Sequence, residues 1–272
     1  MNNEELKQIS QEELDELIEE AKCEKEKNTL LKTRQLFLVL NLGLVYTEEG
    51  DFDKAIECFK KAININLQDA KAHYALGFLY SKQKNFNKAI ECYKKTIELE
   101  PQYEVAHYNL GNVYHDQKDF NKAIECYQKA IEIDPKLAQA HYNLGLVYYD
   151  QKDFNKAIEC YQKAIELNPQ YAVAHYNLGS VYYDQKDFNK AIECYQKAIE
   201  IDPQEADAHY NLGSVYCKQR DFDKAINCYQ KAIEIDPQEA GAYICLGLLH
   251  ARKLDFWNAT AFFCKALSIK KK

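Results

Sequence analysis

A glycine recurs every 34 residues along this 272-residue chain, and this spacing constrains the fold more than any other feature of the sequence. The glycines are Gly43, Gly77, Gly111, Gly145, Gly179, Gly213 and Gly247. Tyrosine, alanine and proline positions recur with the same period. A fixed period of roughly 20–50 residues is typical of proteins built from stacked structural repeats. The sequence therefore predicts seven repeats, at 36–69, 70–103, 104–137, 138–171, 172–205, 206–239 and 240–272.

Each repeat contains two stretches with a helical pattern. In the repeat 138–171, apolar residues of the segment 154–167 recur at i, i+3, i+4 and i+7, which is the stripe of an amphipathic helix. Asp153 stands where an N-cap belongs, and Pro169 follows the last apolar position. Gly145 is small where two helix backbones would come close. A single hairpin cannot bury both of its faces, so we expect an all-α array of stacked antiparallel helix hairpins.

The order Leu-Gly, Tyr, Ala, aromatic, Ala and Pro at this period resembles the tetratricopeptide repeat (TPR) family over residues 36–272. The family's usual tryptophan at the fourth position is histidine in repeats two to six, and its glycine between the helices is Lys or Arg in the same repeats. The family tolerates both substitutions. The resemblance implies a right-handed α-solenoid, or superhelix, of antiparallel helix hairpins that binds other proteins and does not catalyse a reaction.

The charge balance and the apolar runs limit the partners and the location. Asp and Glu number 42 against 35 Lys and Arg, and no basic stripe is visible, so we expect no nucleic-acid partner. The longest apolar run, 36–40, is far shorter than the roughly 20 residues of a spanning helix, so we expect no membrane insertion. The N-terminus has no secretory pattern. We expect a cytoplasmic protein, and a ciliary or other large-assembly location stays open.

Two ladders of potential metal ligands follow the repeat. The histidines are His73, His107, His141, His175 and His209, and the cysteines are Cys58, Cys92, Cys126, Cys160, Cys194 and Cys228. Packed helices lie about 8–10 Å apart, whereas zinc needs its ligand atoms at about 2.0–2.3 Å, so one ion cannot bridge equivalent positions. We interpret both ladders as packing residues. With no phosphate loop, HExxH or CxxC motif in the chain, we expect no catalytic residues, no metal, no cofactor and no enzyme activity.

The resemblance also implies a binding surface. In the family, the first helix of each repeat lines a concave groove, mainly through its second, fifth, sixth, ninth, twelfth and thirteenth positions. The groove residues that we expect here to bind a partner are Tyr108, Asn109, Asn112, Asp116, Tyr142, Asn143, Asp150, Tyr176, Asn177, Asp184, Tyr210 and Asn211.

The residue types in this groove suit an extended segment of a partner protein. An asparagine side chain offers both a donor and an acceptor to a peptide backbone, tyrosines add apolar area, and the aspartates favour a basic segment. Changing Asn143 and Asn177 to Ala should then weaken binding without lowering stability. The alternative is that each Asn is only a soluble helix-surface residue copied with the repeat.

The two ends of the array differ from the middle. In the seventh repeat, an outer helix face that is polar elsewhere carries Trp257, Ala261, Phe262 and Cys264, so we expect a partner or a second copy of the chain to cover it. At the other end, the helix 36–44 is apolar almost all round.

Residues 1–35 are predicted to form an N-terminal capping helix and a charged linker. A capping box of Ser10 and Glu13 begins this helix, apolar residues in 14–21 share one face, and we expect that face to cover the helix 36–44. The stretch 22–27 is either a solvated continuation of the helix or a linker.

These observations favour a non-enzymatic scaffold or adaptor whose groove binds an extended partner segment. The alternative is a structural subunit of a large multiprotein assembly that docks through its apolar terminal repeats.

Overall fold

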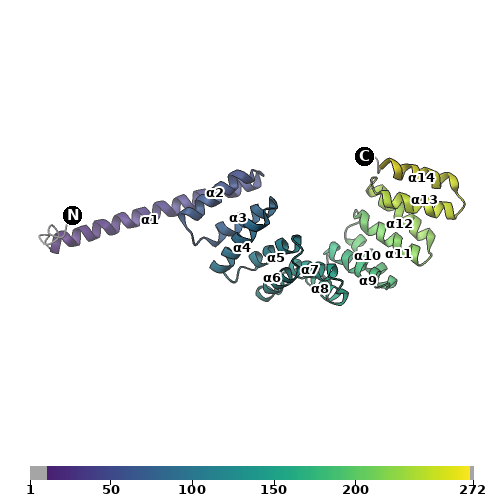
Figure 1. The fold of residues 1–272 in the computed structure, drawn as a ribbon, viewed down its shortest axis with the longest axis horizontal. Helices are drawn as coiled ribbons and strands as arrows, with labels where there is room; N and C mark the ends of the chain where they lie inside the picture. Colours follow the sequence, from purple (N-terminus) through teal and green to yellow (C-terminus); the bar gives the residue numbers. More distant parts are fainter. Residues whose placement is uncertain (1–10, 270–272) are drawn as a thin grey trace. The chain divides into compact units, whose positions relative to one another are not determined.

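The structure, a computed structural model, describes residues 11–269, with the side chains of 11–18, 20 and 21 excepted (Figure 1). Within these residues the chain consists of helices, and no strand is present. The helices are α1 Gln11–Glu48, α2 Phe52–Ile65, α3 Ala70–Lys82, α4 Phe86–Leu99, α5 Glu104–Asp116, α6 Phe120–Ile133, α7 Ala138–Asp150, α8 Phe154–Leu167, α9 Ala172–Asp184, α10 Phe188–Ile201, α11 Ala206–Lys218, α12 Phe222–Ile235, α13 Ala240–Arg252 and α14 Phe256–Ile269.

The chain forms two compact units, residues 1–113 and 114–272, which divide within α5. In the N-terminal unit α1 packs on α2, α3 packs on α4, and α2 contacts α3. In the C-terminal unit the hairpins α7/α8, α9/α10, α11/α12 and α13/α14 follow one another, and the second helix of each hairpin contacts the first helix of the next. The fold is the predicted all-α array of stacked helix hairpins, with one hairpin for each predicted repeat.

Each hairpin turns at a residue with a left-handed backbone, followed by an N-cap. In the fourth repeat, Lys152 has φ 64°, and the Asp153 N–H donates to the Tyr148 carbonyl oxygen over 2.9 Å, which closes the end of α7. The Asp153 carboxylate accepts from the Lys156 N–H at 3.3 Å, as predicted for an N-cap. Leu254 adopts the same backbone at φ 61° in the last repeat. A short polar cap thus begins the second helix directly after the first one ends.

The repeated glycine and the aromatic residue of the second helix form the centre of each hairpin. A Cβ atom at Gly145 would lie 2.7 Å from Cε1 of Tyr161, so only glycine lets the two helices approach this closely. The Tyr161 side chain has no exposed surface, and Ala157 and Ala164 beside it are also fully buried. The period seen in the sequence is therefore the period of the core.

Helix α1 is 38 residues long and unbroken, so the boundary predicted at residue 35 falls inside it. Residues 22–27 continue the helix and form no linker, because no Gly or Pro interrupts 11–42 and the residue types favour helix. Ser10 lies outside the described residues, and nothing is described of the Glu13 side chain, so the predicted capping box cannot be placed.

The expected cover over the apolar helix 36–44 is not formed by the described part of α1, because a continuous helix cannot fold back on itself. Leu38, Leu42 and Val45 are 57%, 45% and 47% exposed. Their counterparts in the second repeat, Ala72, Leu76 and Leu79, are 0–6% exposed because the preceding hairpin covers them.

The ladder histidines and cysteines are packed into the hairpins. His141, His175 and His209 are half-buried, and Nε2 of each lies 3.2–3.3 Å from the carbonyl oxygen of the proline six residues before it. A carbonyl can only accept, so Nε2 carries the proton and donates. Burial raises the pKa of the Cys160 and Cys194 thiols to about 12, so they stay protonated.

We expect the protein to lose stability as the pH falls from 7.5 to 5.5. Burial lowers the pKa of His141, His175 and His209 from the usual 6.5, although each hydrogen bond to a proline carbonyl opposes this. The unfolded chain then binds more protons than the folded chain below about pH 6.5, so acid favours unfolding. Thermal melting across this pH range measures the loss, and changing all three histidines to Phe should flatten the pH profile. An equally steep profile in the triple variant would assign the loss to other groups.

Candidate functional site

Fifth- and sixth-position side chains of neighbouring repeats are joined by hydrogen bonds. In the C-terminal unit, Nδ2 of Asn177 donates to the Tyr142 hydroxyl over 2.8 Å, and Nδ2 of Asn211 donates to the Tyr176 hydroxyl over 2.8 Å. In the N-terminal unit, Nδ2 of Asn109 donates to the Tyr74 hydroxyl over 2.9 Å. The sixth-position asparagine thus bridges to the fifth-position tyrosine of the preceding repeat. We call each such pair a rung.

These bonds correct the interpretation of the asparagines as solvated residues with few packing contacts. Asn109, Asn177 and Asn211 are half-buried. Nδ2 of Asn177 also donates to the Val173 carbonyl oxygen over 3.0 Å, so both of its N–H groups are used inside the protein. Among its side-chain atoms, Oδ1 is therefore the one placed to accept from a ligand. Asn143 and Tyr108 occupy the equivalent positions and are half-buried too.

The rung tyrosines pack against the aromatic core. The ring centroids of Tyr142 and Tyr161 lie 5.8 Å apart, and those of Tyr176 and Tyr195 are also 5.8 Å apart. Burial raises the pKa of Tyr176, and burial followed by the neighbouring Cys245 raises that of Tyr210 to about 12. Neutral hydroxyls with fixed rings make the rungs preorganised hydrogen-bonding groups.

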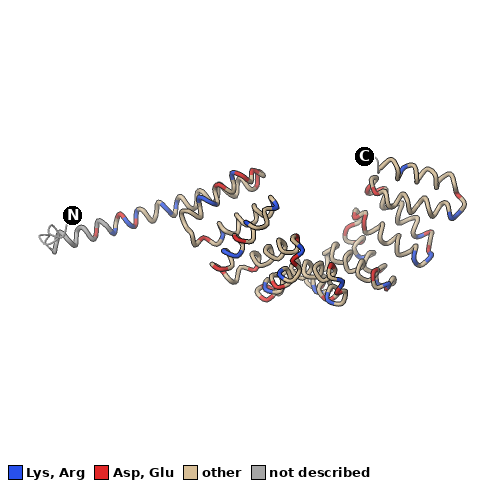
Figure 2. The backbone as a smooth tube through the Cα atoms, viewed as in Figure 1, with Lys and Arg blue, Asp and Glu red and all other residues tan. Residues whose placement is uncertain are grey.

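The predicted acidic residues lie at helix ends, where Figure 2 marks many of the charged positions. Asp116, Asp150 and Asp184 are the last residues of α5, α7 and α9, and all three are exposed. Oδ2 of Asp150 accepts from Nε2 of His115 over 2.9 Å, and Oδ2 of Asp184 accepts from the Tyr149 hydroxyl over 2.8 Å. Each of these two carboxylates is therefore fixed by the preceding repeat and still faces water.

The remaining groove residue, Asn112, is half-buried on α5, where its Nδ2 donates to Oδ1 of Asn109 over 3.3 Å. The structure thus joins Tyr142 to Asn177 and Tyr176 to Asn211 in the C-terminal unit, and Asn109 to Asn112 in the N-terminal unit. We call the fifth- and sixth-position side chains of α7, α9 and α11, together with Asp116, Asp150 and Asp184, the rung face.

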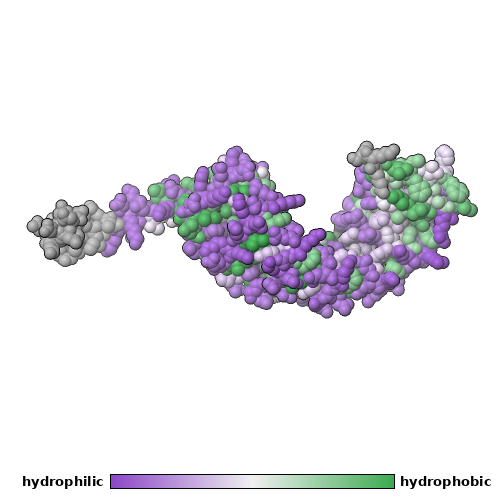
Figure 3. Space-filling view, viewed as in Figure 1, coloured by the Kyte–Doolittle hydropathy of each residue, from purple (hydrophilic) through white to green (hydrophobic). Residues whose placement is uncertain are grey.

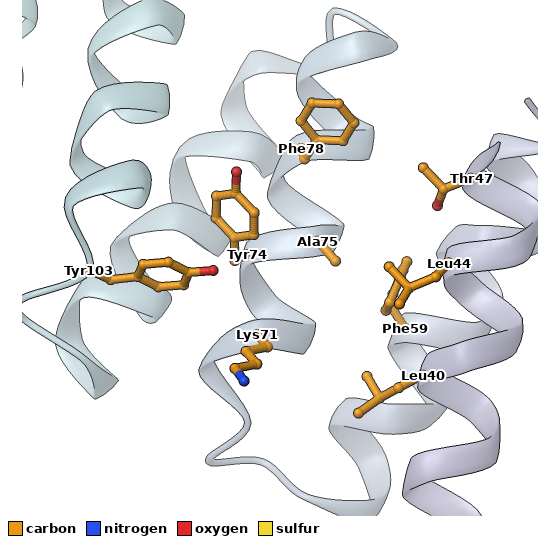
Figure 4. A pocket seen from close by; sticks show the side chains of 9 residues that line it. All are labelled: Leu40, Leu44, Thr47, Phe59, Lys71, Tyr74, Ala75, Phe78 and Tyr103. Carbon is orange, nitrogen blue, oxygen red and sulfur yellow. The ribbon is translucent and has the colours of Figure 1, made fainter. Parts of the chain in front are cut away.

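A cavity that the sequence interpretation missed lies in the N-terminal unit between α1 and α3 (Figure 4). Its volume is about 450 Å³. Its lining residues are Leu40, Leu44, Thr47, Phe59, Lys71, Tyr74, Ala75, Phe78 and Tyr103. A signal was present in the sequence, because the first rung is Leu40 and Ala75 where the next four rungs are Tyr and Asn.

The predicted end patch is formed in part. Trp257 is 86% exposed, and Ala261 and Cys264 are exposed beside it. Phe262 is half-buried instead, because its ring packs on α13 with its centroid 5.3 Å from that of His250. Exposed Phe256 and Leu267 extend the apolar surface, which Figure 3 shows in green over this end of the C-terminal unit.

Metal binding and membrane insertion are two other functions that the described residues bear on. Across the described residues, no three His, Cys, Asp or Glu side chains are grouped so that they could hold a metal ion. None of the described helices is both long enough and apolar enough to cross a membrane.

Stacked hairpins of this kind define a helical-repeat protein, and comparisons with known proteins give the family. Models described as "TPR repeat" match residues 43–84, 111–152, 147–186 and 179–220. Models described as "Tetratricopeptide repeat" match 70–103, 206–239 and 92–125. Together these matches span residues 43–239 without a gap. The chain belongs to the tetratricopeptide repeat family, and the family supports a role as a protein-interaction scaffold.

Solved structures agree with this assignment. MamA is 35% identical, with a TM-score of 0.57 over 60% of this chain and 95% of that one. YrrB, described as a TPR protein with an unusual peptide-binding site, is 30% identical, with a TM-score of 0.59 over 73% of this chain and 99% of that one. PilF of Pseudomonas aeruginosa, at 21% identity and a TM-score of 0.68 over 81% of this chain and 99% of that one, shares the fold. The comparison with curated proteins gave no match.

Proposed function

We propose that this chain is a non-enzymatic scaffold whose rung face binds an extended, basic segment of a partner protein. The observation that carries the proposal is the position of Asp116, Asp150 and Asp184 at the C-terminal ends of three successive first helices. A carboxylate at a helix C-terminus faces the negative end of the helix dipole and costs about 0.3–1 kcal/mol. Helix stability therefore gives no reason for these residues. The bonds from His115 and Tyr149 fix the carboxylates of Asp150 and Asp184, and a cationic ligand would pair with the charge that still faces water.

The spacing of the repeats suits an extended chain. Helices α9 and α11 contact each other, and packed helices lie about 8–10 Å apart. An extended segment advances about 3.3 Å per residue, so every third residue of the ligand meets a new repeat. Oδ1 of Asn177 would accept from a ligand backbone N–H, while the carboxylates of Asp150 and Asp184 would pair with Lys or Arg side chains of the ligand.

A second candidate function is a structural subunit that docks through its apolar end. Trp257 at 86% exposure favours it, because large aromatic side chains on a surface are typical of interface centres. Either a different protein or a second copy of this chain could cover the patch. The peptide-binding site described for YrrB is a property of that protein, and it supports the first candidate only through family membership.

One binding experiment separates the two candidates. Peptides selected from a random display library on the purified chain should carry Lys or Arg about three residues apart. Their affinity, measured by fluorescence anisotropy, should fall several-fold between low and physiological salt because the carboxylates are exposed. Asp150→Asn with Asp184→Asn should weaken binding by about tenfold, since two exposed charge pairs contribute roughly 0.2–1 kcal/mol each.

The matched control removes two carboxylates from the outer helix surface of the same unit. Glu159→Gln with Glu193→Gln, both exposed on α8 and α10, should leave the affinity unchanged. Trp257→Asp should also leave it unchanged. If the outer-face control weakens binding as much as the rung-face variant, the rung face is not the site. If only Trp257→Asp abolishes binding, the second candidate replaces the first.

A further inference from the structure

The first rung differs from the others in a way that opens a cavity. In the second to fifth rungs the two positions are Tyr and Asn, and the hydroxyl and the amide meet across the crevice between two first helices, as those of Tyr142 and Asn177 do. In the first rung the same two positions are Leu40 and Ala75. Neither side chain has a polar atom, and alanine is smaller than asparagine. The crevice that the Tyr and Asn pair fills elsewhere therefore remains open between α1 and α3, and both residues line the cavity there (Figure 4).

The walls of the cavity are apolar and come from several elements. Leu40 and Leu44 come from α1, Phe59 from α2, Tyr74 and Phe78 from α3. A volume of about 450 Å³ lies within the roughly 300–1,000 Å³ of ligand pockets, and such pockets are mostly apolar with a few polar groups. Leu44 is 52% exposed, so a bulky apolar group bound there would remove leucine surface from water.

The rim of the cavity carries positive charge along α3. Lys71 is the single charged residue among the lining residues. Nζ of Lys82, at the other end of α3, lies 5.3 Å from the ring centroid of Phe78, another lining residue. In the third to fifth repeats the position of Lys82 is held by Asp116, Asp150 and Asp184. Burial, followed by the carboxylates of Glu100 and Glu104, raises the pKa of Tyr103, so negative charge lies near that lining residue, and the basic residues named here are both on α3.

We propose that this cavity is an anchor site for a bulky aliphatic or aromatic side chain of a partner segment whose flanking residues are acidic. The apolar side chain enters between Leu40, Leu44 and Phe78, and a flanking carboxylate pairs with Lys71. The chemistry of this ligand is opposite in charge to that of the rung face. The inference rests on the proposed function only in taking the ligand to be a segment of a protein.

The test uses the full chain and short synthetic peptides blocked at both ends. The first probe has a central leucine flanked by glutamates, the second has alanine in place of leucine, and the third has lysines in place of the glutamates. Burying a leucine side chain rather than alanine should make the first probe bind at least about tenfold more tightly than the second. Anisotropy titrations of the labelled probes measure the affinity of the first probe relative to the second and relative to the third.

The variant that closes the cavity copies a rung that the chain already uses. Leu40→Tyr with Ala75→Asn restores the Tyr and Asn pair, so it should fold as the native chain does and lose the tenfold preference for leucine. If the double variant has a lower melting temperature than the native chain, Ala75→Asn alone tests whether filling the cavity removes the preference for leucine. Lys71→Val introduces the residue found at the equivalent position in the third and fifth repeats, Val105 and Val173. This variant should retain the preference for the leucine probe over the alanine probe and lose the preference for glutamate flanks over lysine flanks.

Two results would overturn the inference: equal affinity of the native chain for the leucine and alanine probes, or a full leucine preference in the closed variant. Basic peptides selected on the rung face are measured in parallel. If they bind while the leucine probe does not, the proposed function stands and the anchor site falls. If neither class binds, both proposals fall.

Discussion

Tyr161→Ala will lower the free energy of unfolding by about 3–5 kcal/mol, because it empties the centre of the fourth hairpin. The Tyr161 side chain is fully buried, and its ring fills the space directly over Gly145. Glycine offers no side chain that could move into the cavity. Chemical denaturation followed by circular dichroism measures the change, and a loss below about 1 kcal/mol would mean that the hairpin repacks.

The matched control is Tyr161→Phe, which should raise stability by about 1 kcal/mol. The Tyr161 hydroxyl is buried and has no hydrogen-bond partner among the described residues, so it carries an uncompensated desolvation penalty. In the next repeat the Tyr195 hydroxyl pairs with Ser180 Oγ at 3.1 Å, and there the change to Phe should lower stability. The Tyr161 hydroxyl lacks this partner because the fourth repeat has Leu146 at the position equivalent to Ser180.

The fold could be predicted from the sequence because the same residues recur seven times in one register. Gly145, Asp153 and Ala157 each have a local reason: a close helix approach, an N-cap and a packed interface. The glycine and the alanine recur in every repeat, and the N-cap is Asp in six of the seven and Asn85 in the second. Where the pattern stops repeating, the predictions were weaker. The sequence pattern predicts Phe262 on the outer patch, yet its ring packs on His250.

The N-terminal helix shows a second limit. The segment 14–21 has an apolar face, and the helix 36–44 needs cover, so pairing the two was a reasonable hypothesis. Sequence pattern shows which faces are apolar but not whether a chain bends between them. A turn needs a residue such as Gly or Pro, and α1 has neither between 11 and 42. The absence of a breaker was therefore the informative feature.

The rung hydrogen bonds were the main feature of the candidate site that the pattern did not reveal. Side-chain positions on one helix follow from the period, but contacts between helices of neighbouring repeats depend on how the hairpins pack. The signal in the sequence was the joint change at the first rung, where Leu40 replaces the tyrosine and Ala75 the asparagine. A hydroxyl and an amide that disappear together are expected to be partners.

Asn177→Ala with Asn211→Ala will lower the free energy of unfolding by about 2 kcal/mol, the opposite of the neutral effect expected for solvated asparagines. The two changes remove three hydrogen bonds, to the hydroxyls of Tyr142 and Tyr176 and to the Val173 carbonyl oxygen. Each such bond contributes roughly 0.5–1.5 kcal/mol net, and the better helix propensity of alanine returns only about 0.5 kcal/mol per site. Chemical denaturation measures the result.

The control for that prediction is Asn121→Ala with Asn155→Ala, two exposed residues in the first turns of α6 and α8. They have the same chemistry without a rung partner, so the double change should leave stability within about 0.5 kcal/mol of the native chain. A double-mutant cycle with Tyr142→Phe and Asn177→Ala then assigns the loss to the rung, because the second change should cost less once the first has removed the hydroxyl. If the two double changes alter the free energy of unfolding equally, the rungs do not stabilise the stacking of the repeats. Asn177 and Asn211 would then have a role in ligand binding only.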